Sequence, residues 1–132
     1  MKKLFLSVTL GLVLTACATP STPHLTQAPI KVNQETIKDY WISQSDVQFF
    51  KRPTSAQLRA MEAQKVEIVA SYLVDSNGDI FDVEIVESNV DISFKDLVED
   101  SLEKRNFRPS QSNTYRQPII VLSSFVFEKD PE

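Results

Sequence analysis

The sequence predicts a small α+β domain, in which a three-stranded antiparallel/mixed sheet of strand order 2-1-3 carries two helices packed on one face. Three observations predict this class. Two runs of alternating apolar residues flank Asn77-Gly78, a third apolar run covers 119–127, and a stretch with helical spacing precedes the first run and another precedes the third. Period-two runs of β-branched and aromatic residues are typical of strands, whereas apolar residues at i, i+3 and i+4 are typical of amphipathic helices.

The first 16 residues have the form of a secretory signal peptide. Lys2 and Lys3 precede an apolar run over 4–14, which is shorter than the roughly 20 residues that span a bilayer. The run ends in Leu14-Thr15-Ala16-Cys17, which resembles the lipobox of bacterial lipoproteins. This resemblance implies that Cys17 is lipidated, for example with palmitate, and becomes the mature N-terminus.

An ordinary signal peptide that leaves Cys17 as a free thiol is the alternative. Because Cys17 is the only cysteine, no disulfide is expected within the domain. By resemblance to lipoprotein sorting, Ala18 after the cysteine implies the outer membrane, with the chain on its periplasmic face.

Residues 17–34 are predicted to be the lipidated cysteine and a flexible tether rich in proline and threonine. A stretched chain of this length reaches about 55 Å. The only histidine, His24, stands in this tether without a second ligand, so neither a metal nor a cofactor is expected.

Without the leader the chain is acidic. The sequence has 14 basic and 18 acidic residues, of which the leader holds two basic and no acidic ones, so the mature 116 residues carry 12 against 18, a balance of −6. This argues against nucleic acid or anionic lipid headgroups as partners. Membrane attachment is therefore expected through the lipid anchor.

Residues 35–52 are too apolar for a linker and are predicted to dock on the domain. Trp41 in this segment could anchor a ligand or a partner. It could also enlarge the core, which is the more common role of aromatic residues beside a small domain, and we favour this second interpretation.

A first helix is predicted over 55–64, opened by Pro53 in its first turn. Leu58 and Met61 stand three residues apart, and Ala60 and Ala63 lie beside them. Together they are expected to form one apolar stripe against the sheet.

The hairpin is predicted over 66–86. Asn77-Gly78 supplies the positive φ angles of a tight turn between its strands. The segment 75–79 also resembles a calcium-binding loop, but Ile80 and Val86 stand where that pattern requires glycine and glutamate. The turn therefore explains the segment better than a metal site does.

A second helix follows the hairpin. Ser93 and Asp96 have the spacing of an N-terminal capping box, and the residue before Pro109 ends the helix. Its apolar stripe consists of Phe94, Leu97, Val98, Ser101 and Leu102. The third strand, 119–127, is apolar at both alternations, which indicates contacts on both faces or a partner on one. The economical topology leaves this strand at an open edge of the sheet.

From Pro53 to Phe127 the sequence resembles the C-terminal domain of TonB, the Gram-negative energy transducer, so residues 53–129 are assigned to a TonB C-terminal-like domain. The matching features are Asp75 and Gly78 at the turn, Asp82-Val83 and Ile85 in the second strand, Ser88, Phe94, Phe107-x-Pro109 and Phe125-x-Phe127. The family's Tyr-Pro, a glycine and a tryptophan are replaced by Arg52-Pro53, Ala63 and Arg105. Where the family has a transmembrane anchor and a long proline-rich spacer, this sequence has the lipobox leader, so energy transduction is not implied.

The resemblance implies a non-enzymatic binding function linked to TonB-dependent outer-membrane transport. A periplasmic segment of an outer-membrane transporter or envelope protein would add as a strand to the third strand. The residues expected at this site are Phe107, Arg108, Ile119, Val121, Ser123 and Phe125.

Two alternatives remain at this stage. The edge could be covered by the 31–50 segment, or by a second copy in a homodimer through the third strand. The function could instead be structural, as an envelope lipoprotein that contacts peptidoglycan or a secretion or assembly subunit. An enzyme is not expected, because no serine or cysteine stands beside a base, and Asp82, Glu84 and Glu87 are predicted on an outward face.

Overall fold

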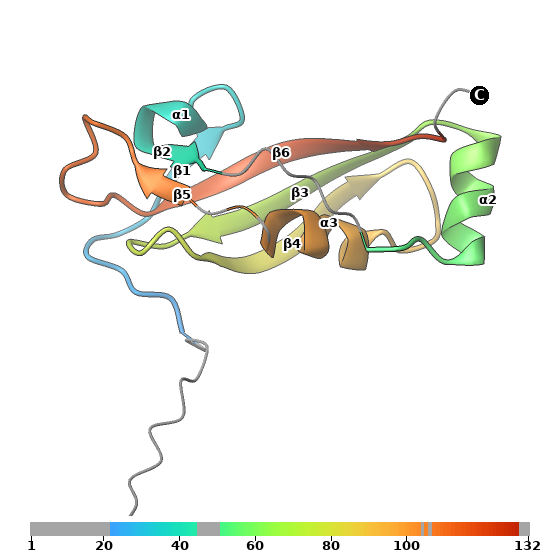
Figure 1. Cartoon of the computed structure of the whole chain (residues 1–132), viewed down its shortest axis with the longest axis horizontal. Helices are drawn as coiled ribbons and strands as arrows, with labels where there is room; N and C mark the ends of the chain where they lie inside the picture. Colours follow the sequence, from blue (N-terminus) through green and yellow to red (C-terminus); the bar gives the residue numbers. More distant parts are fainter. Residues whose placement is uncertain (1–21, 45–50, 104, 106, 130–132) are drawn as a thin grey trace, which may run out of the picture.

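The computed structural model describes residues 22–44, 51–103, 105 and 107–129 (Figure 1). The predicted signal peptide, Cys17 and the start of the predicted tether lie outside the described residues. The elements in chain order are β1 (Ile30–Asn33), α1 (Ile37–Tyr40), β2 (Trp41–Ser43), α2 (Ser55–Ala63), β3 (Val66–Val74), β4 (Ile80–Ser88), α3 (Lys95–Glu103), β5 (Phe107–Pro109) and β6 (Ile119–Phe127).

The main sheet has the strand order β1-β6-β3-β4, and β2 and β5 form a second, two-stranded sheet. Strand β3 pairs antiparallel with both β4 and β6, whereas β1 pairs parallel with β6. The α+β class, the mixed sheet and the central position of the first predicted strand are therefore confirmed. The predicted three-stranded sheet is wrong by one strand, because β1 adds a fourth.

Burial along β3 and β6 follows the predicted alternation. One side of β3 is fully covered, with Val66, Ile68, Ala70, Tyr72 and Val74 at most 1% exposed. The residues of β6 on the same face are also buried, and the Phe94 and Phe127 rings pack with their centroids 5.3 Å apart. This face of the sheet is the core of the domain.

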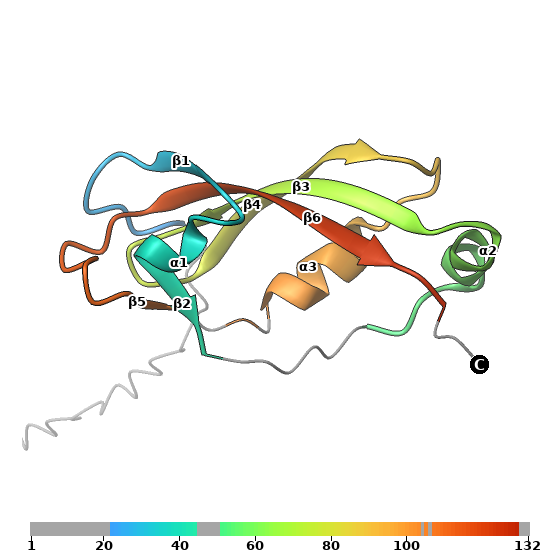
Figure 2. The same ribbon diagram turned by 90° about the horizontal axis from the view of Figure 1, so that it is seen from above.

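Helix α3 covers the core face of the sheet (Figure 2). Its buried residues are Leu97, Val98, Ser101 and Leu102, which belong to the predicted stripe.

Helix α2 does not lie on that face, so the prediction of two helices packed on one face is wrong. It stands at the end of the sheet where β3 begins and β6 ends (Figures 1 and 2). Two residues, Gln64 and Lys65, separate its end from β3. Leu58, expected against the sheet, is 46% exposed, and Ala60 and Met61 are only partly buried.

Polar contacts attach α2 to the start of α3. Gln57, which is 4% exposed, donates from Nε2 to the Ser93 carbonyl and to Asp96 Oδ1, each at 2.9 Å. Thr54 and Gln57 form a capping box at the start of α2. Asp96, predicted to cap its own helix with Ser93, thus receives a hydrogen bond from α2, while Ser93 Oγ accepts from the Lys95 amide.

The hairpin is confirmed, but its turn differs from the predicted one. The Gly78 amide donates to the Asp75 carbonyl at 3.0 Å, so Ser76 and Asn77 are the central residues of the turn. Gly78 has φ of +84°, and Asn77 does not have a positive φ. Asp75 Oδ1 accepts from the amides of Asn77 and Asp79, both at 2.9 Å. This side-chain acceptor favours a five-residue loop over a two-residue one.

The hairpin turn packs against the small β2–β5 sheet. A Cβ built on Gly78 would lie 2.4 Å from the Phe107 carbonyl oxygen and 3.3 Å from the Trp41 ring. Trp41 is 1% exposed and donates from Nε1 to the Gln117 carbonyl at 2.8 Å. Within the segment predicted to dock, Trp41 lies in the core and β2 pairs with β5, and residues 45–50 lie outside the described residues.

Candidate functional site

Most of the side chains predicted to bind a partner face the core instead. Ile119, Val121, Ser123 and Phe125 alternate along β6 and are at most 9% exposed, and Phe107 is also buried. Arg108 is exposed, but it lies on β5, opposite Ile42 in the small sheet. Five of the six residues expected at the binding site thus turn their side chains into the core. Strand addition at β6 would depend on its backbone groups.

The edge of β6 is closed over part of its length by the chain itself. Strand β1 pairs with β6 from Ile30 opposite Ile119 to Asn33 opposite Leu122. The predicted open edge is therefore wrong over 119–122. The alternative prediction, an edge covered by the 31–50 segment, agrees better with the structure, since three of the four β1 residues belong to that segment.

The same pairing corrects the predicted tether. Residues 22–34, which we call the strap, follow the surface of the domain instead of forming a free linker (Figure 1). At the hairpin turn, the His24 amide donates to Asp75 Oδ2 at 2.9 Å, and the His24 carbonyl accepts from the Ser76 amide at 2.8 Å. The Thr26 amide donates to Ser76 Oγ at 2.9 Å.

Two glutamines attach the rest of the strap to β6. Gln117 Nε2 donates to the Ala28 carbonyl at 2.9 Å, immediately before the Ile30 amide donates to the Pro118 carbonyl at 3.2 Å. After β1 ends, Gln34 Oε1 accepts from the Ser124 amide at 3.2 Å. The strap thus satisfies outward amide groups of β6 as far as Ser124.

The other long edge of the sheet, on β4, is blocked by its own irregularity. Val86 is the extra residue of one bulge, and a second bulge places Asp82 and Val83 opposite Tyr72. Asp82 has φ of +54°, and the β4 carboxylates Asp82, Glu84 and Glu87 are exposed. Bulges and charges are the features that keep an edge strand from pairing with another chain. Beyond Leu122, where β1 ends, β6 has no such bulge in its pairing with β3.

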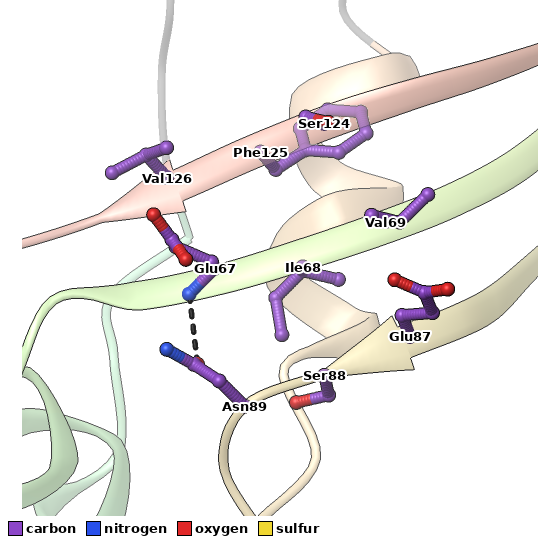
Figure 3. Close-up of a pocket in the computed structure, with 9 residues that line it drawn as sticks. All are labelled: Glu67, Ile68, Val69, Glu87, Ser88, Asn89, Ser124, Phe125 and Val126. Atoms are coloured by element: carbon purple, nitrogen blue, oxygen red, sulfur yellow. Dashed lines mark hydrogen bonds between the residues drawn. The ribbon is translucent and has the colours of Figure 1, made fainter.

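A shallow groove is lined by residues of β4, β3 and β6, with β3 between the other two strands (Figure 3). Its volume is about 400 Å³, and Glu67, Glu87 and Val126 are among the residues that line it. Val126, Leu122 and Val86 are about half exposed, at 51%, 50% and 54%. The surface next to the edge is therefore apolar and flanked by acids.

Two titratable groups near the strap and the core have shifted pKa values. Burial raises the pKa of Tyr72 above its ordinary value of 10.0, against the opposing effects of its Ser123 hydrogen bond and of Arg105. Partial burial and the nearby Asp75 carboxylate raise the pKa of Asp79 above 3.8. A phenol that stays protonated is a structural hydrogen-bonding group at neutral pH, so Tyr72 suits the core better than catalysis.

Other classes of site find no support in the part of the chain that the structure describes. There, no three His, Cys, Asp or Glu side chains are grouped as metal ligands. None of the helices described is long and apolar enough to cross a bilayer.

Sequence reasoning missed the residues that hold the strap: Gln34, Asp75, Ser76 and Gln117. An aspartate at the first position of a turn indicates an acceptor for local amides, so Asp75 had a local signal. Nothing in the sequence connects Ser76 or Gln117 to the strap, because their contacts join residues 50 and 89 positions apart.

Comparison with known proteins adds a likeness of fold. No protein-family description and no curated protein matches this sequence. Among solved structures, the chain is similar to the solution NMR structure of the Pseudomonas aeruginosa TonB CTD, with 17% sequence identity and a TM-score of 0.49, covering 76% of this chain and 96% of that one.

Proposed function

We propose that this protein is a lipid-anchored, periplasm-facing binding module that captures an extended segment of an envelope protein by strand addition at the edge of β6. The observation that carries the proposal is the β1–β6 pairing, because it places an extended segment on that edge. An exposed strand edge offers rows of amide and carbonyl groups that any extended chain can satisfy.

The described residues leave part of this edge for a partner. Strand β1 ends opposite Leu122, and no described strand pairs on that side of β6 beyond this residue. The apolar surface of Leu122 and Val126 adjoins this stretch, and Glu67 and Glu87 flank it. This surface suits a segment with apolar and basic side chains, since the mature chain carries a balance of −6.

Two sequence features support the cellular setting. The Leu14–Cys17 lipobox-like motif favours a lipid anchor at the outer membrane, and the resemblance to TonB C-terminal domains over 53–127 favours a partner in outer-membrane transport. On this proposal the partner is the periplasmic segment of a transporter.

The test is a titration of the isotope-labelled chain from Ala18 on with synthetic peptides from the periplasmic segments of outer-membrane transporters. Saturable shifts of the amides at 123–126 are expected. Ser124→Pro removes an amide that points outward from the edge, toward Gln34, so it should weaken binding at least about tenfold, whereas the matched control Ser124→Ala should not.

If the chemical shifts of the amides at 123–126 do not change at a saturating peptide concentration, the proposal is contradicted. A structural envelope lipoprotein would then be the better description, and binding of the same protein to purified peptidoglycan would be measured next.

A further inference from the structure

The backbone of the strap makes many of its contacts, beside hydrogen bonds of the Thr26 and Gln34 side chains and the packing of Val32. Beside the β1–β6 pairing, main-chain groups of the strap bond to the domain through the amides of His24, Thr26 and Ile30 and the carbonyls of His24 and Ala28. Such contacts do not depend on the side chains of the bound segment. Any extended peptide that follows the same path could make them.

The groups that receive the strap belong to the folded domain and are fixed by other contacts. Asp75 and Ser76 are 1% and 0% exposed. Asp75 is held by the turn amides that its other oxygen accepts. The backbone of Gln117 is held on both sides. Its main-chain amide donates to Asn113 Oδ1 at 2.8 Å, and its main-chain carbonyl accepts from Trp41 Nε1. Asp75 and Gln117 thus have partners in the domain besides the strap.

The strap itself is lightly held. None of its 13 residues is buried; Pro23, Pro29 and Val32 are the most covered, and Leu25 and Ile30 remain 44% and 37% exposed. Its strand is four residues long. Because side-chain burial contributes most of the stability of a docked segment, a contact of this kind opens at lower free energy than the core does.

From this asymmetry we infer that the surface running from Asp75 and Ser76, past Gln117, to the β6 edge is a peptide-binding track that the chain's own strap occupies. The inference rests on the proposed function and extends it in two ways. The ligand is an extended peptide of about the strap's length, contacting the hairpin turn as well as the strand edge. The strap competes with that ligand, so its release determines the apparent affinity.

The track also indicates which ligand side chain matters. Val32 is the β1 residue that packs against the core, opposite Val121. We expect a bound peptide to need an apolar residue at this position and to tolerate polar residues elsewhere in the strand.

A proline pair tests the competition. Alternate amides of a strand point to opposite sides. Since the Ile30 amide donates to β6, the Val32 amide faces β6 too, and that of Lys31 faces away. Val32→Pro should therefore release the strap, whereas Lys31→Pro should leave it bound. The probe is a synthetic peptide of residues 22–35, added to the labelled chain from Ala18 on.

The probe is expected to bind Val32→Pro at least about tenfold more tightly than the wild type or Lys31→Pro, with shifts at Ser76, Gln117 and 119–124. Equal binding to all three proteins, or shifts that omit Ser76 and Gln117, would overturn the inference. Thr26→Val, which removes the hydroxyl contacts to Ser76, Tyr115 and Arg116, provides a milder variant if Val32→Pro does not give a folded spectrum. A smaller increase in the same direction is expected for it, and no increase would count against the track.

The transporter peptides separate this inference from the proposed function. If they bind Val32→Pro and the wild type equally at 123–126, the binding function holds and the track is wrong. If only the peptide of residues 22–35 binds, the track holds and the assignment of the partner is wrong.

Discussion

Two segments that precede the domain dock on it by different means. The segment 35–44 inserts Trp41, which is 1% exposed, and pairs β2 with β5. The strap, 22–34, buries none of its residues and depends on hydrogen bonds to its backbone. Burial of a large aromatic side chain contributes several times the free energy of one hydrogen bond, which adds about 1 kcal/mol. The first segment is therefore part of the core, and the second is suited to detachment.

The largest expected effect is on the core-bound segment. Trp41→Ala removes a buried ring and leaves the Gln117 carbonyl without its donor, so the free energy of unfolding should fall by about 3–5 kcal/mol. Urea denaturation checks this. The exposed Ile42→Ala in the same strand is the control and should change the value by less than about 1 kcal/mol. A Trp41→Ala protein of wild-type stability would place the segment outside the core.

The next effect concerns the turn on which both segments converge. Gly78→Ala imposes a Cβ at a positive φ and 2.4 Å from the Phe107 carbonyl oxygen. The hairpin must move away from β5, at a cost of about 2 kcal/mol or more. The melting temperature should fall. Asn77→Ala, at an exposed neighbouring position without a positive φ, should change it less.

A substitution at the hairpin turn should destabilise the docking of the strap without destabilising the core. Ser76→Ala removes the Oγ that accepts the Thr26 amide, a loss of about 1 kcal/mol that is confined to the strap. Hydrogen exchange should accelerate at the Ile30 amide and remain unchanged at the β3 amides. If exchange accelerates equally in both, the strap and the core open as one unit.

The smallest effect depends on pH. The pKa of Asp79 is higher in the folded chain than its ordinary value of 3.8. The folded state therefore binds more protons, so the contribution of Asp79 favours folding below pH 3.8 and is lost as the pH rises through the raised value. Asp79→Asn should accordingly be slightly more stable than the wild type at pH 7, and this advantage should disappear near pH 3. Urea midpoints at both pH values measure it, and an advantage that grows toward low pH would contradict the assigned direction.

Under the proposed lipid anchoring, the state of the strap would also set the reach of the domain from the membrane. If Cys17 is the anchor, Thr22 stands five residues from it, a reach of about 17 Å. With the strap released as far as Gln34, the reach becomes about 55 Å. Binding in the track would thus change how far the domain extends from its anchor.

Much of the fold was accessible from sequence because its signals are local. The alternation over 66–74, the glycine at 78 and the helical spacing after Ser93 predicted β3, the hairpin and α3. The side-chain period of a strand or helix is set by its own backbone, so one segment reveals it. The candidate site was less accessible. The apolar residues at both alternations of 119–127 indicated contacts on both faces of this strand. They did not indicate that the odd-numbered residues face the core.

The sequence by itself determined three strands, two main helices, their order in the sheet and the acidic charge. Only the tertiary structure decided three further features. Helix α2 stands at the end of the sheet, Asp96 accepts a hydrogen bond from Gln57 of α2, and residues 30–33 form a strand. Strand β1 has no recognisable period in its four residues. It is extended because β6, some 89 residues further along the chain, presents the groups with which it pairs. Such a contact depends on which surfaces meet after folding, and no local pattern encodes it.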